Sequence, residues 1–254
     1  EYGEGCISML NVTARQELMS KIVETLGMVV EDARFDFEED GLHICVVDAS
    51  HVAMLKVDVD AAAFETWEID ESKIGFDVRK VKELLTLGGA NDLIEFSYGD
   101  ETGVLTINLG KIDRNIRPLD NSIMTSPPVP ELDFPCRAVI GGAQFSQALR
   151  AARQVGDLVH FSLTEESFTI HVQGSADSVT VVFEKEDLVS IECAEPARSQ
   201  YSLQYLVGMA KIFGSLEEVS LGFGDNFPLS MKFSFADGAA EVEYFLAPRV
   251  ENDN

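Results

Sequence analysis

Basic residues are scarce in this sequence. Lysine and arginine number 19 against 44 aspartates and glutamates, which gives a formal net charge of −25. A protein that coats nucleic acid indiscriminately needs an excess of bases to displace counterions from the phosphates. The composition therefore excludes a general nucleic-acid coat, unless the few bases gather on one surface while acids cover the rest. An acidic proteome adapted to salt, in which surface charge serves solubility, is an alternative source of the charge.

Long apolar runs and clustered cysteines are also absent. The longest hydrophobic stretches are broken by charges, as between Leu42 and Lys56, so none is long enough to cross a bilayer. The four cysteines, which form no CxxC pair, are Cys6, Cys45, Cys136 and Cys193. Because a structural zinc site requires clustered ligands, the sequence predicts reduced, mostly buried thiols in an intracellular protein.

Signatures of catalysis are missing as well. The sequence contains no GxSxG, Walker or GxGxxG motif. The four histidines, which show neither HxxxH spacing nor carboxylate-flanked pairing, are His43, His51, His160 and His171. Asp58 and Asp60 form a close pair that is expected to be a solvated strand edge. We therefore expect no catalytic residue, no metal and no cofactor, because a metal-dependent enzyme would need several carboxylates converging in one cleft.

A unit of strand, helix and strand pair recurs about four times along the chain. In the first copy, residues 6–12 read as a strand, and Thr13 with Gln16 forms a capping-box signal for a helix. Apolar residues follow at helical spacing, namely Leu18, Met19, Ile22, Val23, Leu26 and Val30. Alternating strands at 33–37 and 42–46, joined by a Glu-Asp-Gly turn, predict a hairpin.

The second half of the chain repeats this pattern. A strand is predicted to break at Gly141-Gly142, before a helical stripe of Phe145, Ala148, Leu149, Ala152 and Val155. Each half also contains a second, shorter helix, with Asp77 and Ser202 as N-cap candidates. Further strands are predicted at 93–98, 104–109, 136–140, 158–163, 168–172, 219–223 and 229–235. Most connections are too short for parallel crossovers, so we predict an α+β protein of antiparallel sheets with helices on one face.

A proline-rich connector separates the halves. Residues 118–135 contain five prolines, which make the segment stiff and extended and keep it out of a sheet interior. Its apolar residues, Ile123, Met124, Val129, Leu132 and Phe134, suggest a strap that lies against the protein. The predicted organisation is an N-terminal domain at 1–117, a connector at 118–135 and a C-terminal domain at 136–254.

Three segments in the same order resemble motifs of one protein family. Residues 40–55, from Asp-Gly-Leu-His to the Asp-Ala-Ser-His-Val stretch, form the first. Val129-Pro130 to Phe134 resembles the end of an interdomain connector. Tyr-Phe-Leu-Ala-Pro-Arg-Val at 244–250, with acidic Glu251 and Asp253 after it, resembles a C-terminal motif. Together with the repeat, they are similar to the PCNA-type DNA polymerase sliding clamps of archaea and eukaryotes over nearly the whole chain.

The resemblance implies two similar domains with two helices each, assembled into a closed ring of three subunits. It implies that residues 111–116, with the strand before them, pair with 178–184 of a neighbouring subunit. Such pairing satisfies edges that would otherwise invite aggregation. Whether the ring is a homotrimer or a heterotrimer stays open.

The resemblance also implies that the helices line a hole around duplex DNA. Contacts to phosphate are independent of base sequence, which suits a protein that slides. The candidate DNA-binding residues are Lys21, Arg79, Lys82, Lys111, Arg150 and Lys211. Ordinary solvated helix faces are the alternative interpretation of these bases.

A second implied site is an apolar groove on the outer face. There the family binds a short partner motif, the PIP box, by plugging apolar anchors into the groove. The candidate partner-binding residues are His51, Val52, Met54, Val129, Pro130, Phe134, Pro228, Tyr244, Ala247, Pro248 and Val250. For Val52 and Met54 alone, burial in the core is the simpler interpretation.

The expected function is therefore that of a non-enzymatic clamp, a processivity factor that encircles duplex DNA without sequence preference. The expected partners are DNA polymerase, the clamp loader, flap endonuclease and DNA ligase, and the expected location is inside the cell with the chromosome. A specialised clamp subunit for DNA-damage signalling is an alternative on the same fold. An acidic scaffold that never encircles DNA is the alternative from another class, and the basic helices argue against it.

Overall fold

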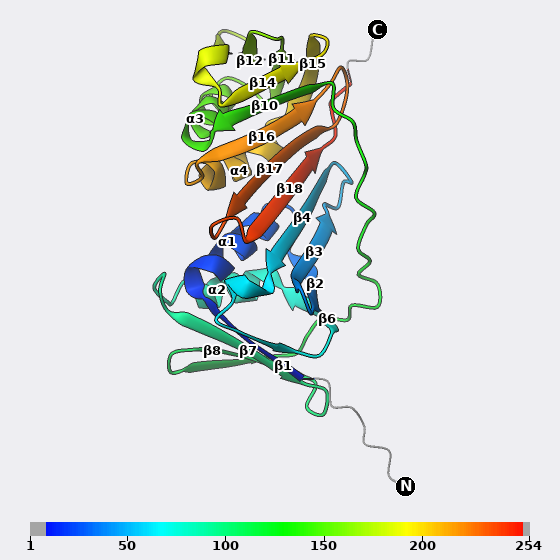
Figure 1. Cartoon of the computed structure of the whole chain (residues 1–254), viewed down its shortest axis with the longest axis vertical. Helices are drawn as coiled ribbons and strands as arrows, with labels where there is room; N and C mark the ends of the chain where they lie inside the picture. Colours follow the sequence, from blue (N-terminus) through cyan, green and yellow to red (C-terminus); the bar gives the residue numbers. More distant parts are fainter. Residues whose placement is uncertain (1–8, 251–254) are drawn as a thin grey trace. The chain divides into compact units, whose positions relative to one another are not determined.

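The computed structural model describes residues 9–250 of the 254-residue chain (Figure 1). The chain divides into two compact units. The first unit contains the described residues up to 47 together with 55–128 and 235–241, and the second contains 48–54, 129–234 and the described residues from 242 onward. Cys6 and the acidic residues Glu251 and Asp253 lie outside the described residues.

The first unit is built from antiparallel strands and two helices. Its elements are β1 (Met9–Arg15), α1 (Gln16–Gly27), β2 (Asp32–Glu38), β3 (Gly41–Val47), β4 (Ala53–Asp60), η1 (Ala61–Ala63), β5 (Thr66–Ile69), β6 (Ser72–Asp77), α2 (Val78–Leu85), β7 (Leu93–Gly99), β8 (Val104–Leu109) and β9 (Ile112–Ile116). One sheet has the order β5-β1-β7-β8-β9, and β4, β3, β2 and β6 are neighbours in that order in another.

The second unit repeats this composition. Its elements are β10 (Cys136–Gly141), α3 (Gly142–Arg153), β11 (Leu158–Leu163), β12 (Ser167–Gln173), β13 (Ser178–Glu184), η2 (Lys185–Asp187), β14 (Ser190–Cys193), β15 (Ala197–Ser202), α4 (Gln204–Phe213), β16 (Glu218–Phe223), β17 (Leu229–Phe235) and β18 (Ala240–Leu246). One sheet has the order β13-β12-β11-β15, and β14, β10, β16, β17 and β18 are neighbours in that order in another. The predicted α+β class with antiparallel sheets is confirmed.

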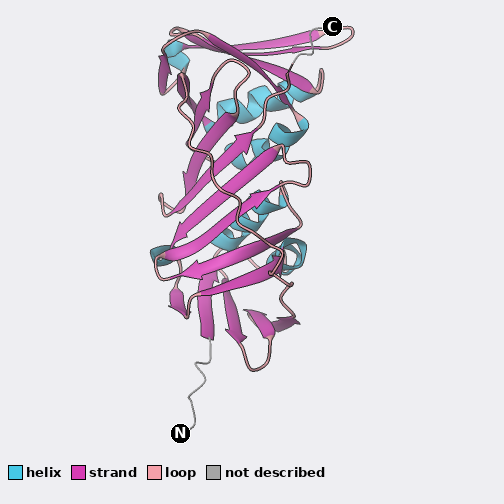
Figure 2. Cartoon of the chain, turned by 90° about the vertical axis from the view of Figure 1, so that its right-hand side faces the viewer, coloured by secondary structure: helices cyan, strands magenta, loops and turns pink. Residues whose placement is uncertain are grey.

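Each unit packs its two helices against one another, α1 with α2 and α3 with α4. Figure 2 shows the helices of each unit on one side of its strands. The apolar stripes face inward, and the buried members are Leu18, Met19, Ile22, Val23 and Leu26 of α1 and Phe145, Ala148, Leu149 and Ala152 of α3. The predicted stripes extend too far at their ends, because Val30 and Val155 lie beyond the last helical residues Gly27 and Arg153.

The helix starts differ from two of the predicted caps. The Thr13–Gln16 capping box is wrong, because Thr13 continues β1 and Arg15 occupies the N-cap with no side-chain hydrogen bond. The Gln16 side chain instead donates to the Leu85 carbonyl at 2.8 Å. Ser202 also remains in its strand, and α4 begins after Leu203. The Asp77 cap is confirmed, since its carboxylate accepts from the Arg79 and Lys80 backbone N–H groups.

The β2–β3 hairpin forms as predicted across a two-residue turn, with Glu38 opposite Gly41. Gly41 has φ +152°, and a Cβ at this position would lie 2.0 Å from the Val59 carbonyl oxygen. Only glycine can therefore close this turn against the neighbouring β4 strand. The turn matters because it places Asp40 beside the side chains of β3.

The connector residues up to Pro127 are held mainly through backbone groups rather than through apolar side chains. Leu119 N donates to the Gly75 carbonyl at 2.9 Å, beside strand β6. Arg34 Nη1 donates to the Met124 carbonyl at 2.8 Å while the same guanidinium binds both oxygens of Asp36. Ile123 is 85% exposed. The predicted strap therefore contacts the first unit here by hydrogen bonds, because its extended backbone presents an N–H group to the edge carbonyl of Gly75 and a carbonyl to Arg34.

Candidate partner and nucleic-acid interfaces

All eleven predicted partner-binding residues belong to the second unit. The loop before β4 is organised by the nearly buried Asp48, whose Oδ1 accepts from Val52 N at 2.7 Å and Ala53 N at 2.8 Å. His51 adopts a left-handed backbone with φ +55°. This loop leaves the His51 side chain exposed and the Val52 side chain half-buried. Its shape is set by side-chain-to-backbone bonds that need no core packing.

The C-terminal segment is tied to this loop by its backbone. Ala247 N donates to the Val52 carbonyl at 2.9 Å, and Arg249 N donates to the Gln200 carbonyl of β15 at 2.8 Å. Ala247 and Pro248 are half-buried, whereas Val250 is 65% exposed. The structure thus brings the predicted loop and C-terminal residues side by side and leaves apolar surface on them.

Two of the predicted partner residues are largely buried. Tyr244 is 1% exposed, and its hydroxyl donates to the Tyr205 carbonyl at 2.9 Å. Burial raises the pKa of the Tyr244 phenol, so the hydroxyl remains a donor. Phe134 is 8% exposed and meets the Phe227 ring edge-on, with centroids 5.7 Å apart. Both rings therefore belong largely to the core of the second unit, whereas Pro228 is half-buried.

Beside the connector end lies a recess that the sequence did not indicate. It has a volume of about 440 Å³ and is lined by Pro130, Glu131, Leu132, Asp133, Phe134, Arg137, Lys232, Glu243 and Phe245. Arg137 stacks over the Phe134 ring at 5.4 Å, and Lys232 pairs with Glu243 at 3.6 Å. The recess therefore combines charged side chains with the apolar side chains of the connector end. Alternation along β10, β17 and β18 was the only available signal for Arg137, Lys232 and Glu243.

The predicted DNA-binding residues differ in whether an acid already neutralises them. Lys21 pairs with Glu17 at 3.7 Å and lies over the Phe235 ring, and Arg79 pairs with Glu31 at 3.3 Å. Lys82 on α2, Arg150 on α3 and Lys211 on α4 are exposed, and no carboxylate of residues 9–250 lies within ion-pair distance of them. The same holds for Lys111, which is exposed in the turn before β9. The helices thus carry cations that remain available to an external anion.

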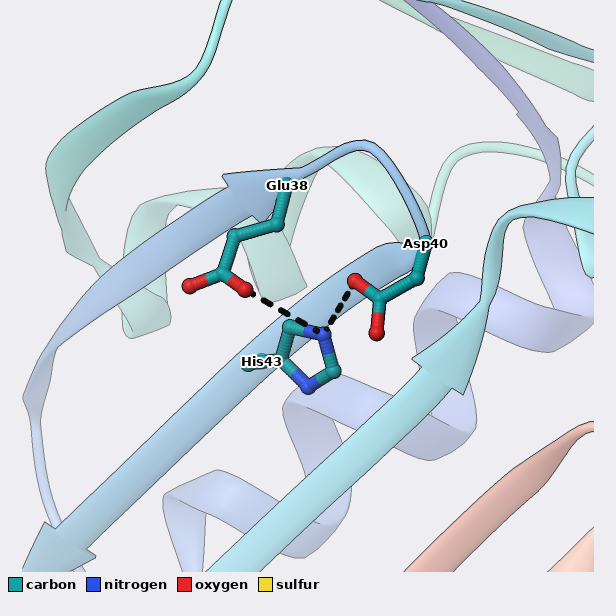
Figure 3. Close-up of side chains that lie close together, drawn as sticks. All are labelled: Glu38, Asp40 and His43. Carbon is teal, nitrogen blue, oxygen red and sulfur yellow. Dashed lines mark hydrogen bonds and ion pairs between the residues drawn. The ribbon is translucent and has the colours of Figure 1, made fainter.

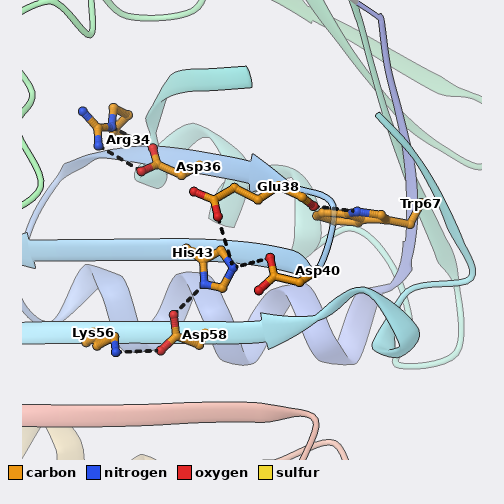
Figure 4. A network of polar contacts seen from close by, with 8 residues as sticks. All are labelled: Arg34, Asp36, Glu38, Asp40, His43, Lys56, Asp58 and Trp67. Atoms are coloured by element: carbon orange, nitrogen blue, oxygen red, sulfur yellow. Dashed lines mark hydrogen bonds and ion pairs between the residues drawn. The ribbon is translucent and has the colours of Figure 1, made fainter. Parts of the chain in front are cut away.

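A cluster on the first unit contradicts the expectation that no histidine is flanked by carboxylates. His43 of β3 has Asp58 Oδ1 at 2.7 Å from Nδ1 and Asp40 Oδ1 at 2.8 Å from Nε2, and Glu38 Oε2 lies 3.8 Å from Nε2 (Figures 3 and 4). Asp58 also pairs with Lys56 at 3.3 Å. The prediction that Asp58 is simply a solvated residue at a strand edge is therefore wrong. The sequence alone did not indicate this cluster, because Asp58 and His43 are 15 residues apart and meet only where β4 lies beside β3 in the sheet.

Both ring nitrogens of His43 face carboxylate oxygens, which can only accept hydrogen bonds when ionised. The geometry therefore favours the imidazolium form with two donated N–H groups. Burial lowers the pKa of His43, but the hydrogen bonds to Asp58 and Asp40 raise it by more, so the pKa lies above its ordinary value. The hydrogen bond from His43 in turn lowers the pKa of Asp40.

The same cluster is relevant to metals. Within residues 9–250, the ligand atoms of Glu38, Asp40 and His43 lie within 4.8 Å of one another, close enough to surround an ion. The imidazolium already supplies a positive charge to these carboxylates, which explains the arrangement without an ion. The expectation that the chain holds no metal stays a prediction.

Two units of this kind, each with a helix pair against antiparallel sheets, define a protein of the DNA-clamp class. The family model described as "Proliferating cell nuclear antigen, N-terminal domain" matches residues 9–123, and the corresponding C-terminal domain matches residues 128–249. The chain belongs to the proliferating cell nuclear antigen family, as the resemblance implied. The predicted limits at 117, 118, 135 and 136 stay predictions.

Relatives and solved structures agree with this assignment. The protein named "DNA polymerase sliding clamp" from Archaeoglobus fulgidus is 33% identical over 247 residues, and that from Methanosarcina barkeri is 30% identical over 246 residues. Each match covers 96% of this chain and all of the relative. A structure of A. fulgidus PCNA bound to the C-terminal region of FEN-1 has a TM-score of 0.90 at 32% identity, covering 96% of this chain and all of that chain. None of the helices in residues 9–250 is both long and apolar enough to span a membrane.

The His43 cluster makes stability depend on pH. A pKa that is raised on folding contributes stability fully below the unfolded value of about 6.5, and the contribution is lost as pH rises through the folded pKa. We expect the free energy of unfolding of the wild type, relative to His43→Gln, to fall by up to about 1 kcal/mol between pH 6 and 9, a modest amount because the side chain is 30% exposed.

Urea unfolding at several pH values measures this difference. The exposed residue His51, replaced by Asn to suit its left-handed backbone, is the control for the loss of a histidine outside the cluster. A wild-type advantage over His43→Gln that stays constant or grows with pH would contradict the imidazolium assignment.

Proposed function

We propose that this chain is one subunit of a DNA sliding clamp, a ring of three that encircles duplex DNA and tethers replication proteins to it. The observation that carries the proposal is the match of both domains, over 96% of the chain, to proteins named DNA polymerase sliding clamp. The clamp works by topology and has no chemistry of its own. We place its action inside the cell, at the chromosome.

The edges of the sheets support a ring. Strands β6 and β15 are each covered at one point, by Leu119 on Gly75 and by Arg249 on Gln200. Strands β5 and β14 have only four residues each. The longer edge strands β9 and β13 remain, and each carries an exposed apolar side chain, Ile112 at 41% and Val182 at 47%. Long open edges attract another strand, so β9 of one subunit pairs with β13 of the next.

The hydrogen-bond alternation in β13 identifies which N–H groups are open. Lys185 N donates to the Glu166 carbonyl and Gly174 N to the Asp177 carbonyl, which fixes the pattern between β12 and β13. Residues 179, 181 and 183 therefore bond to β12, and residues 178, 180, 182 and 184 direct their N–H and C=O groups away from it. A proline at 181 would break the internal ladder, whereas a proline at 182 removes only an outward donor.

The ring prediction follows from this pattern. Val182→Pro should give folded monomers, because it removes an edge donor without touching the β12 ladder. Native mass spectrometry and light scattering across a range of salt measure the assembly, and circular dichroism measures the fold. Val182→Thr keeps the N–H and the β-branched shape, so this control should remain a trimer. A Val182→Pro protein that stays trimeric would rule out β13 as the subunit interface.

The unpaired helix cations support a channel for DNA. Lys82, Arg150 and Lys211 come from three different helices and keep their charges free in a protein of net charge −25. Point contacts of this kind to phosphates hold duplex DNA without reading bases. Lys21 and Arg79 contribute less, because acids already pair with them. Lys111 lies in a turn rather than on a helix and is a weaker candidate.

Reversing Lys82, Arg150 and Lys211 to Glu should weaken duplex association and lower the salt slope of log K by about 3, near one for each phosphate contact. The measurement is duplex binding and polymerase stimulation at several salt concentrations. Reversal of the exposed residues Lys73, Arg117 and Lys185 changes the net charge equally and is the control.

Topology gives an independent readout for the same proteins. Rings loaded on circular DNA should be retained, and they should slide off once the DNA is linearised. Equal duplex affinity of wild type and triple variant at low salt would exclude these residues from the channel, while loss from linear DNA would still support the clamp.

The apolar surface on the second unit supports binding of partner motifs. Loop residues 51–54 and the C-terminal residues 247–250 offer apolar side chains, and the connector end lines a recess that also contains charged side chains. The partners we propose are DNA polymerase, the clamp loader, flap endonuclease and DNA ligase, each through a PIP-box segment. Binding then rests on burial of apolar area, reduced by the cost of ordering a peptide.

A peptide with Gln-x-x-apolar-x-x-Phe-Phe spacing should bind with a Kd of roughly 1–50 μM. Met54→Ala and Val250→Ala should each cost about 1–3 kcal/mol of binding free energy, as expected for residues that line a desolvated pocket. Isothermal titration calorimetry measures both. Ile123→Ala, which truncates an exposed apolar residue of the connector, should change nothing. If the double variant binds as tightly as wild type, these residues do not form the groove.

A further inference from the structure

Two buried thiols lie in contact on neighbouring strands of the second unit. Cys136 is the first residue of β10 and Cys193 is the last residue of β14, and the antiparallel register places them directly opposite one another. Their sulfur atoms are 3.1 Å apart. Cys136 is 0% exposed and Cys193 is 7% exposed. Cys45, by contrast, has the Pro127 carbonyl as its sulfur's partner, at 3.6 Å.

The backbone around the pair has the spacing that a disulfide requires. Ala194 N donates to the Pro135 carbonyl at 3.1 Å, so the bond joins the residues just outside the pair. This makes Cys136 and Cys193 a non-hydrogen-bonded antiparallel pair, in which Cα atoms approach to about 4.5 Å. Disulfides span Cα separations of roughly 4.4–6.8 Å. The strands therefore already hold the two cysteines at a bonding distance, and only side-chain rotation is needed.

We propose that Cys136 and Cys193 form a reversible modification site, at which a low-molecular-weight disulfide oxidises the two thiols to an intramolecular disulfide that staples β14 to β10. The clamp function does not depend on this bond. The sequence predicted that these cysteines would be reduced thiols, and the pairing across two strands adds a second accessible state.

The exposures indicate the order of the exchange. Cys193 is the more accessible thiol, and it ends a four-residue strand at the edge of its sheet, where local opening costs little. Burial, together with the hydrogen bond to Cys193, raises the pKa of Cys136 to about 12, so Cys136 is a poor first nucleophile. Cys193 therefore attacks first, and Cys136 resolves the intermediate.

The reaction balances as two exchanges. The Cys193 thiolate attacks one sulfur of the small disulfide, forms a mixed disulfide and releases one small thiolate. The Cys136 thiolate then attacks the Cys193 sulfur and releases the second small thiolate. The two protons of the protein thiols end on the two released thiols. The protein is oxidised by two electrons, and the small disulfide is reduced to two thiols.

The test uses the full chain with oxidised glutathione as the oxidant. A Cys6→Ser, Cys45→Ser variant leaves only the proposed pair. Its reduced form should show two thiols on alkylation in denaturant, and its oxidised form should show none. Non-reducing peptide mapping of the wild type should find Cys136 joined to Cys193, with Cys45 still alkylated. Dithiothreitol should restore both thiols.

Stability supplies a second readout. A bond between residues 57 positions apart constrains the unfolded chain, so oxidation should raise the Tm by roughly 5–10 °C. Cys136→Ser and Cys193→Ser should each abolish the bond and the shift, while Cys45→Ser should keep both. Wild-type peptide mapping decides the question even if a serine variant fails to fold. Thiols that survive oxidised glutathione, a persistent glutathione adduct, or a bond to another cysteine would each overturn the proposal.

Discussion

Backbone groups at the edge of a sheet must find a partner or face water, and the architecture of this chain depends on how its edges are treated. Leu119 bonds to Gly75 on β6, and Arg249 bonds to Gln200 on β15, so the connector and the C-terminal segment each cover an edge. The short strands β5 and β14 offer little to pair with. Among residues 9–250, the edge strands that remain are β9 in one unit and β13 in the other, and the proposed pairing of β9 with β13 of a neighbouring subunit would satisfy both at once.

The distribution of charge also depends on which groups find a partner within the chain. Acids outnumber bases by 44 to 19, so most of the surface repels a polyanion. Several bases are neutralised locally, as Arg79 is by Glu31 and Arg153 is by Asp157. The exceptions Lys82 and Arg150 stand on helices with no acid in reach among residues 9–250. The proposed channel, attractive within a repulsive surface, would favour encirclement over coating, because the phosphates would gain contacts only from the inside.

Polar bonds also decide which parts of the partner surface are rigid. Asp48 holds the loop at 50–53 through its carboxylate, and the Val52 carbonyl then accepts from Ala247. Tyr244 and Phe134, two of the predicted partner residues, are largely buried. A short motif would therefore meet a largely preorganised site, which lowers the ordering cost of binding to that of the peptide alone.

Much of the fold was predictable from local sequence signals. Hydrophobic periodicity identified the buried faces of α1 and α3 and the alternating strands, because one face of each element must be buried. The Asp77 cap and the turn before Gly41 followed from residues with narrow conformational preferences. The helix starts near Thr13 and Ser202 were wrong, because β1 and β15 extend through those residues and tertiary pairing overrides a cap.

The sequence by itself determined the repeat, the class of fold, the set of scarce bases and the apolar C-terminal motif. Tertiary structure decided which of those bases remain unpaired, that Asp58 meets His43, and that Cys136 lies on Cys193. The last pair is 57 residues apart in the chain, and such contacts carry no local signal. Periodicity reports which face a residue occupies, whereas strand order and register decide what it touches there, because both are set by hydrogen bonds between segments distant in sequence.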